Sequence, residues 1–288
     1  MFTKGSDPAE RNTSAALHRK GAHMKYGFIG GGNMGGAMAK AAAAVVGGAN
    51  VLLCDRDEAT TKMLADKLGV TASSYEQIVA GSRLIFVAVK PNLVVPVLEK
   101  LRDMLQARAD KPCVVSIAAG VTIETMMGVL GEDIPLIRMM QNTPVALGQG
   151  MLVYACAPSA SEADAAALEA CMAAAGRISP LPEKLIDAAT AVMGCGPAFV
   201  YMFAEALADG GVACGLPRAQ AQTYAAQTLL GAAKMLLETG EHPGALKDAV
   251  CSPGGSTIQG VRVLEENGLR GATIDAVIAA YQKTQGLG

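Results

Sequence analysis

The chain contains few of the residues that usually carry acid–base catalysis. Its 288 residues include three histidines and no tryptophan, and charged residues make up only 17%. His18 and His23 lie near the amino terminus, which leaves His242, in a polar turn before Pro243, as the one histidine of the remaining sequence. Enzymes that act on alcohols or ketones commonly use a His or Lys to move the hydroxyl proton. We therefore expect a reaction that needs no strong base.

Charge and cysteine usage exclude several classes of partner. The formal net charge of −2 provides no basic surface for nucleic acid. Seven cysteines, an odd number without a Cys-x-x-Cys pair, favour a reduced, cytoplasmic protein with no disulfide framework and no metal site. The most apolar stretch, residues 188–204, is interrupted by Gly194-Cys-Gly-Pro197 and falls short of the roughly 20 unbroken residues that span a bilayer. We expect no membrane segment.

A glycine-rich turn follows the first predicted strand. Tyr26, Phe28 and Ile29 form a short apolar run, and the alanine-rich segment 34–46 has the character of a helix. Between them, the spacing Gly30-x-Gly32-x-x-Gly35 is the one with which a dinucleotide-binding fold brings its backbone close to a pyrophosphate. The turn predicts a dinucleotide site.

The end of the next predicted strand, residues 50–54, supports this interpretation. Asp55 and Arg56 follow it, about 20 residues after the last glycine, where a ribose-binding residue is expected. Asp55 could accept a hydrogen bond from a 2′-hydroxyl, as NADH requires, whereas Arg56 could bind the 2′-phosphate of NADPH. Both cofactors stay open at this point.

Alternating strands and helices continue to about residue 182. Apolar runs at 83–89, 113–117 and 134–138 predict buried strands, with edge strands at 150–155 and 177–179 and helices at 94–105 and 162–175. We predict an α/β fold, with a doubly wound (Rossmann) parallel sheet in residues 24–182. Residues 1–23 lack apolar periodicity and are expected to be a disordered extension or tag.

Strand signals stop after Pro180-Leu-Pro182. Residues 183–288 read as apolar helices, which predicts an all-helical domain for substrate binding and dimerisation. In the helix expected at 197–214, Phe199, Phe203 and Leu207 recur at helical spacing and are expected in a core. About a hundred residues of such helix cannot easily bury every apolar face alone, so we expect packing against a second copy.

The second candidate site is the turn Ser252-Pro-Gly-Gly-Ser-Thr257. Pro253 and the two glycines stop one helix, and Ser256 and Thr257 are suitable N-caps for the next, 258–264. Free N–H groups and the helix dipole make such a start a receptor for a carboxylate. The nitrogen of an imine can take up a proton before or during hydride attack, so a hydroxyl such as that of Thr257 suffices as its hydrogen-bond partner. A carboxylated cyclic imine suits both features.

Four segments resemble the pyrroline-5-carboxylate reductase family. They are Gly27-Phe-Ile-Gly-Gly-Gly-Asn-Met34; Ala88-Val-Lys-Pro91; Gly194-Cys-Gly-Pro-Ala198 with Glu205–Val212 and Gly215-Leu-Pro217; and Ser252–Thr257. The resemblance implies reduction of 1-pyrroline-5-carboxylate to L-proline with NADPH or NADH, the last step of proline biosynthesis. It also implies a homodimer built from interlocked carboxyl-terminal helices, often assembled into a decamer.

The resemblance and the strand ends together give a set of expected site residues. Thr257 is expected to be catalytic. Substrate contacts are expected from Glu183, Ser252, Gly254, Gly255, Ser256 and Thr257. Cofactor contacts are expected from Gly30, Gly31, Gly32, Asn33, Met34, Gly35, Asp55, Arg56, Ala88, Val89, Lys90, Pro91, Ala118 and Ala119.

Two departures from the family pattern and two alternatives remain. Gln141 stands where the family usually has proline, and Cys195 stands where it usually has serine, a stronger hydrogen-bond donor. A β-hydroxyacid dehydrogenase has a similar plan, but it places a catalytic lysine on the first long helix of its second domain, and residues 194–211 contain none. A dinucleotide-binding regulator without turnover is the other alternative, and the intact Ser252–Thr257 segment disfavours it.

Overall fold

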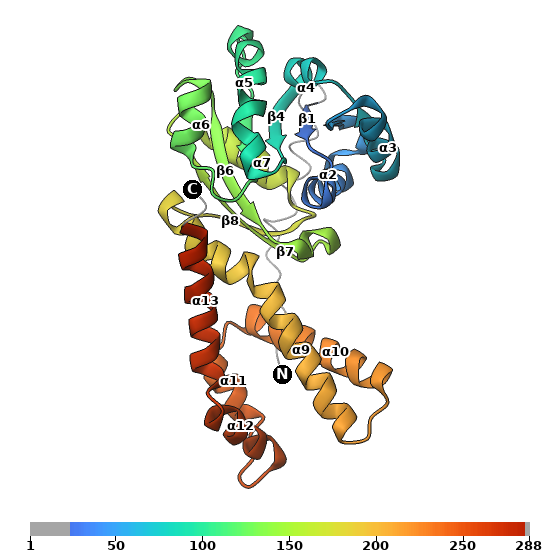
Figure 1. Ribbon diagram of the computed structural model, residues 1–288, viewed down its shortest axis with the longest axis vertical. Coiled ribbons are helices and arrows are strands. Elements are labelled where there is room, and N and C mark those ends of the chain that lie inside the picture. Colours follow the sequence, from blue (N-terminus) through green and yellow to red (C-terminus); the bar gives the residue numbers. More distant parts are fainter. Residues whose placement is uncertain (1–23, 286–288) are drawn as a thin grey trace, which may run out of the picture.

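The computed structural model describes residues 24–285, which form a sheet-based part and a helical part (Figure 1). The expectation for residues 1–23 lies outside the described residues. One sheet of eight strands runs in the order β3 (Thr71–Ala72), β2 (Val51–Cys54), β1 (Lys25–Ile29), β4 (Ser82–Val87), β5 (Cys113–Ser116), β6 (Leu136–Gln141), β7 (Gly150–Cys156), β8 (Gly176–Pro180).

The sheet is parallel from β3 to β6 and reverses once. Strand β7 pairs antiparallel with β6, and β8 is parallel to β7. The expectation of a parallel sheet is therefore wrong for its last two strands. The reason is the short connection between β6 and β7, which holds only the 3₁₀ turn Thr143–Leu147, because a parallel return needs a crossover of a dozen or more residues.

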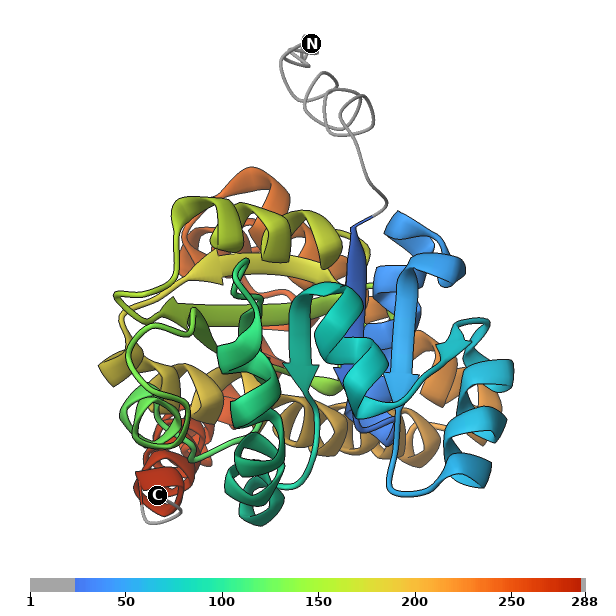
Figure 2. The ribbon, with the colours of Figure 1, turned by 90° about the horizontal axis from the view of Figure 1, so that it is seen from above.

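Helices cover both faces of the twisted sheet, as Figure 2 shows from above. Helices α2 (Asn33–Val46) and α7 (Glu162–Cys171) pack in one apolar cluster, in which the fully buried rings of Phe28 and Phe86 stack with centroids 4.4 Å apart. The other cluster contains α4 (Tyr75–Gly81), α5 (Pro91–Ala107) and α6 (Ile123–Leu130). Helix α3 (Glu58–Leu68) follows β2. The doubly wound arrangement is confirmed.

The helical part begins with one long helical segment. It comprises a 3₁₀ turn (η4, Glu183–Leu185), α8 (Ile186–Ala189), a π turn (η5, Thr190–Gly194) and α9 (Gly196–Ala213). Then follow α10 (Arg218–Thr239), α11 (Pro243–Ala249), α12 (Ser256–Glu266) and α13 (Leu269–Gln285).

The segment Gly194-Cys-Gly-Pro197 does not interrupt this helix, contrary to the sequence expectation. The N–H of Cys195 donates to the carbonyl of Thr190 at 3.0 Å, a π-type bond that accommodates the following proline. Glu183–Ala213 is thus 31 residues long, and by length and composition alone it is a candidate membrane span, although only 11% of its most apolar window is buried inside the chain.

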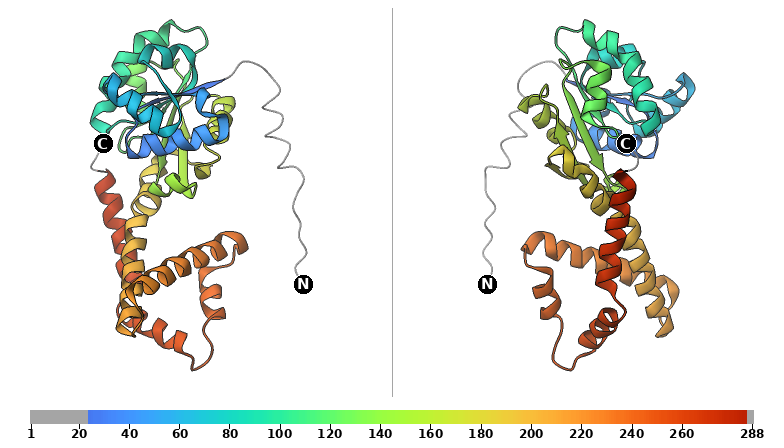
Figure 3. Two further views of the ribbon diagram at one scale, coloured as in Figure 1. Left: turned by 90° about the vertical axis from the view of Figure 1, so that its right-hand side faces the viewer. Right: turned by 60° about the vertical axis from the view of Figure 1, so that its left-hand side comes forward.

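The helical part projects away from the sheet (Figures 1 and 3). Many of its large apolar side chains are exposed among the described residues. Exposed side chains include Tyr201 (63%) and Met202 (70%) on α9 and Ile274 (60%) on α13. Phe203 and Leu207, expected in a core, are exposed as well. That expectation is wrong for the single chain because no second layer of helices within residues 24–285 covers this face.

Candidate active site

The turn between β1 and α2 depends on glycine at two positions. Gly30 has a φ of 104°, and a Cβ there would overlap the carbonyl oxygen of Ala88 at the end of β4. A Cβ on Gly35 would overlap the carbonyl oxygen of Gly30, so Gly35 allows α2 to approach the turn. Glycine at these two positions therefore allows the turn, α2 and β4 to pack in close contact.

The amino terminus of α2 points its free N–H groups into the same region. Its N-cap is Gly32, and no side chain of residues 24–285 caps it. Asn33 is the first helical residue and lines the pocket beside this turn. A helix start of this kind, with backbone N–H groups available and a positive dipole end, fits a pyrophosphate.

Asp55 occupies the carboxyl end of β2 beside the glycine turn. Its Oδ2 accepts a hydrogen bond from the N–H of Gly31 at 2.6 Å, and its Oδ1 accepts one from the N–H of Arg56 at 2.7 Å. The N–H of Asp55 in turn donates to Thr61 Oγ1 at 2.8 Å. These bonds fix the carboxylate at the position where a ribose hydroxyl is bound in dinucleotide folds.

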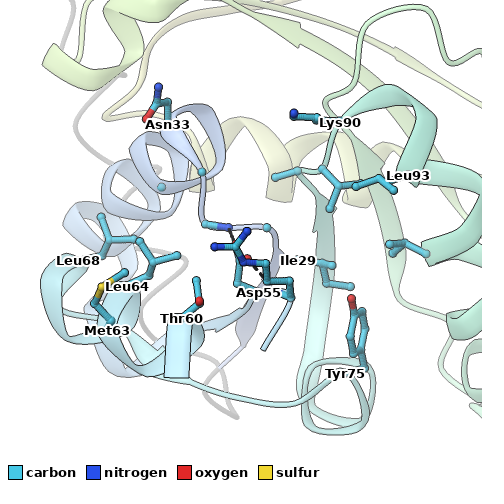
Figure 4. Close-up of a pocket in the computed structure, with 18 of the residues that line it drawn as sticks. Ile29, Asn33, Asp55, Thr60, Met63, Leu64, Leu68, Tyr75, Lys90 and Leu93 are labelled. Carbon is cyan, nitrogen blue, oxygen red and sulfur yellow. Dashed lines mark hydrogen bonds between the residues drawn. The ribbon is translucent and has the colours of Figure 1, made fainter. Parts of the chain in front are cut away.

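These features line one pocket of about 940 Å³ (Figure 4). Figure 4 shows Asn33 and Lys90 on opposite walls, with Asp55 between them. Of the expected cofactor residues, the pocket is lined by Gly30, Gly31, Gly32, Asn33, Asp55, Arg56, Ala88, Val89 and Lys90. Its volume and its donors fit an extended dinucleotide.

The other five expected cofactor residues are not among those that line the pocket. Gly35 packs under the turn, Met34 packs against the core, and Pro91 is the first residue of α5. Ala118 is buried and Ala119 half-buried beyond β5. Their contact with a cofactor stays a prediction.

Sequence reasoning missed two walls of the pocket. Helix α3 contributes Thr60, Met63, Leu64, Lys67 and Leu68, and helix α5 contributes Leu93, Pro96, Val97 and Lys100, with Tyr75 from α4. The position of these helices in the sequence could have indicated their role, because α3 and α5 directly follow the strand ends that carry Asp55 and Lys90. The apolar residues of these helices carry no motif that distinguishes a pocket wall from a core.

The second turn, Ser252–Thr257, has the open helix start that the sequence predicts, with one correction. The N-cap of α12 is Gly255, and Ser256 and Thr257 are its first helical residues. Gly254 has a φ of 69°, which favours glycine, and a Cβ on Gly255 would require the Ser252 hydroxyl to turn away. Among the described residues no side chain caps α12, and Ser256 and Thr257 are both exposed.

Within one chain, the two turns do not face each other. Helix α12 lies at the end of the helical part farthest from the sheet, whereas the pocket lies on the sheet-based part (Figures 1 and 3). Helix α12 packs on α13. The sequence places both turns on one chain and carries no signal of the distance between them.

Glu183 lies at the junction of the two parts. Its Oε1 accepts a hydrogen bond from the N–H of Ile123, at the start of α6, at 2.7 Å and lies 3.4 Å from the guanidinium of Arg138. Asp187 Oδ1 pairs with the same guanidinium at 2.6 Å, and only 5% of the Arg138 side chain is exposed. Glu183 thus anchors the long helix to β6 and α6, and its contact with substrate stays a prediction.

The two departures from the family pattern lie at the same junction. Gln141, at the end of β6, is buried, and its Nε2 donates to the carbonyl of Ile117 at 3.4 Å. Asn142 Nδ2 donates to the carbonyl of Met193 at 3.0 Å, which ties β6 to the π turn. Cys195 is half-buried at the start of α9.

A Rossmann-type sheet with this pocket, joined to a helical domain, defines a nicotinamide-dinucleotide-dependent oxidoreductase. Residues 25–120 match the family described as NADP oxidoreductase, coenzyme F420-dependent, and residues 183–287 match pyrroline-5-carboxylate reductase dimerisation. The chain is 42% identical over 268 residues to pyrroline-5-carboxylate reductase of Escherichia coli, covering 91% of this chain and 98% of that one. It is 40% identical to pyrroline-5-carboxylate reductase 3 of Danio rerio, covering 92% of each.

Solved structures agree with these matches. The fold is similar to a pyrroline-5-carboxylate reductase from Coxiella burnetii, with a TM-score of 0.86 and 30% identity over 93% of this chain and 99% of that one. It is also similar to the Plasmodium falciparum pyrroline carboxylate reductase with NADP bound, with a TM-score of 0.81 and 31% identity over 92% and 98% of the two chains. The chain belongs to the pyrroline-5-carboxylate reductase family and is an NAD(P)H-dependent oxidoreductase.

Proposed function

We propose that this protein reduces 1-pyrroline-5-carboxylate to L-proline by hydride transfer from NAD(P)H, as the last step of proline biosynthesis in the cytoplasm. The observation that carries the proposal is the pair of open helix starts, one at α2 above the glycine turn and one at α12 after Gly254-Gly255. The first suits the cofactor's pyrophosphate and the second suits the substrate carboxylate. NADPH or NADH supplies the hydride when it is bound.

The two turns are brought together, we propose, by a second copy of the chain. Helix α12 lies at the end of the helical part farthest from the sheet, whose strand ends carry the pocket (Figure 1). The exposed apolar residues of α9 and α13, with Tyr201 and Met202 among them, favour burial against a partner of the same kind. The match of residues 183–287 to a dimerisation domain supports a homodimer. Assembly of such dimers into a decamer is part of the proposal.

In the shared site, the residues of the Ser252–Thr257 turn and the start of α12 have separate roles in binding the substrate. The N–H groups that open α12 receive the carboxylate, and the Thr257 hydroxyl lies in the first turn, where it can donate to the ring nitrogen. Ser252, Gly254, Gly255 and Ser256 shape this turn. We propose that Glu183 contacts the substrate. We also propose that the domain boundary lies between residues 182 and 183, where the matched dimerisation region begins.

The direct test is oxidation of NADPH and NADH, followed by absorbance, with five- and six-membered cyclic imino acids as substrates. We expect faster turnover with the five-membered ring. One methylene in a pocket changes binding by only about 1–3 kcal/mol, so weaker activity on the six-membered ring is also expected. Absence of turnover with either ring would contradict the proposal.

A further inference from the structure

The turn that follows β2 carries more negative than positive charge. Asp55, Arg56, Asp57 and Glu58 are consecutive, and their formal charges of −1, +1, −1 and −1 sum to −2. Asp55 and Arg56 line the pocket. In dinucleotide folds this turn receives the adenosine ribose, whose 2′-hydroxyl is free in NADH and phosphorylated in NADPH.

Asp55 is held in place rather than free to turn away. Its two carboxylate oxygens accept separate backbone hydrogen bonds, from Gly31 at 2.6 Å and from Arg56 at 2.7 Å. In Figure 4 the side chain lies in the pocket, near Thr60. A carboxylate retains further lone pairs for a ribose hydroxyl, but it repels a phosphate in the same place.

The start of α3, which follows this turn, is capped by a carboxylate of the chain itself. Asp57 is the N-cap of α3, and its Oδ1 accepts a hydrogen bond from the N–H of Thr60 at 2.8 Å. Its Oδ2 accepts one from the Thr60 hydroxyl at 2.9 Å. The hydrogen bonds from Thr60 hold the pKa of Asp57 below its usual range, so this carboxylate is ionised at neutral pH. The positive end of the α3 dipole is therefore already paired with the Asp57 carboxylate.

Arg56, the cation next to Asp57 in the sequence, is close enough to form an ion pair with the Asp57 carboxylate. The Nε of Arg56 lies 3.5 Å from Asp57 Oδ2, and the Arg56 side chain is 82% exposed. The other cations of the pocket come from elsewhere: Lys90 and Lys100 from the start and middle of α5, and Lys67 from the last turn of α3. Lys67 is ten residues along the chain from Asp57, or roughly 15 Å along a helix axis.

We infer that this enzyme prefers NADH to NADPH, because the fixed carboxylate of Asp55 lines the pocket at the ribose position and Asp57 adds a second negative charge beside Arg56. The inference rests on the proposed use of the pocket for a nicotinamide dinucleotide. It names the specificity-determining residues of that pocket.

Binding without substrate tests the inference separately from catalysis. Dissociation constants are measured by calorimetry for ADP-ribose and for 2′-phospho-ADP-ribose, and by fluorescence for NADH and NADPH. We expect the forms without the phosphate to bind more tightly, on the order of tenfold, since juxtaposed like charges are unfavourable. Equal affinities, or tighter binding of the phosphorylated forms, would overturn the inference even if the reductase activity is present.

Two variants and one control assign the effect to these residues. Asp55→Asn and Asp57→Ser each remove one negative charge, and a serine in place of Asp57 would still cap α3. Both should improve binding of the 2′-phosphorylated forms relative to the others. Asp66→Asn makes the same charge change on the exposed side of α3, outside the pocket, and should leave the ratio unchanged. Thermal melting verifies folding, and an unaltered ratio in both folded variants would refute the assignment.

Discussion

The guanidinium of Arg138 and the carboxylate of Asp187 form an ion pair at 2.6 Å that fastens the long helix to the sheet. Arg138 belongs to β6 and is 5% exposed, and Asp187 belongs to α8. The pair holds the end of the dinucleotide-binding part and the start of the helical part in one fixed arrangement. The hydrogen bonds from Ile123 to Glu183 and from Asn142 to Met193 join the same two parts.

Asp187→Ala tests the contribution of this pair to stability. Among the described residues, the change leaves the buried Arg138 charge with Glu183 at 3.4 Å as its remaining ion-pair partner. This should lower the free energy of unfolding by about 1–3 kcal/mol. Denaturant titration measures it. Asp103→Ala removes one member of an exposed pair with Arg102 and should change stability by less than about 0.5 kcal/mol. Equal effects in the two variants would disprove the structural role of the junction.

Gly30→Ala tests the steric argument for the glycine turn. A left-handed φ and the overlap with the Ala88 carbonyl predict a loss of about 1–3 kcal/mol of stability together with weaker nucleotide binding. At Gly32 the φ is −61° and a Cβ would meet nothing within 4 Å. Gly32→Ala should therefore cost less stability. If both variants melt alike, steric crowding at Gly30 is not what selects glycine there.

Met202→Glu tests whether the exposed face of α9 is buried in a dimer. Met202 is 70% exposed in the single chain, and a buried carboxylate at this position would oppose association. We expect a lower mass by light scattering, loss of turnover, and retained nucleotide binding, because the pocket lies within one chain. Val45→Glu, on α2 of the sheet-based part, should leave the mass unchanged. A dimeric Met202→Glu protein would show that this face is not the interface.

Thr257→Ala tests the hydroxyl proposed to serve the imine. Removing it should lower kcat by about tenfold or more, with little change in nucleotide affinity. Thr273→Ala is the matched control, since the Thr273 hydroxyl bonds only to the Leu269 carbonyl within α13 among the described residues. Unchanged turnover in Thr257→Ala would remove this residue from the mechanism.

Much of the sheet-based part was predictable from local patterns. Apolar runs such as 83–89 indicate buried strands, and the glycine spacing indicates where the backbone needs room for a close approach. Both signals come from residues that are near one another in the sequence. The reversal at β7 was not predictable in this way, because it depends on the length of the connection after β6 rather than on the strand sequence. Glycine and proline at 194–197 suggested a helix break, yet a π turn absorbs them.

The candidate site was predictable as two separate turns but not as one assembled site. The motifs around Gly30 and Gly254 indicate turns from neighbouring residues alone, and both glycines have a positive φ in the structure. Their separation arises from how α12 packs on α13 at the far end of the helical part, which no local spacing records. The pocket walls from α3 and α5 were missed since their apolar residues look like ordinary core.

The most direct test of the shared site mixes two defective subunits. Gly30→Ala weakens nucleotide binding and Thr257→Ala lowers kcat, so each protein alone should be much less active than the wild type. In a heterodimer, one site then carries both defects and the other carries neither. After unfolding and refolding an equal mixture, we expect activity to return to about a quarter of the wild-type value, because half of the dimers hold one intact site of two. Activity that stays at the level of the parent variants would contradict a site shared between two chains.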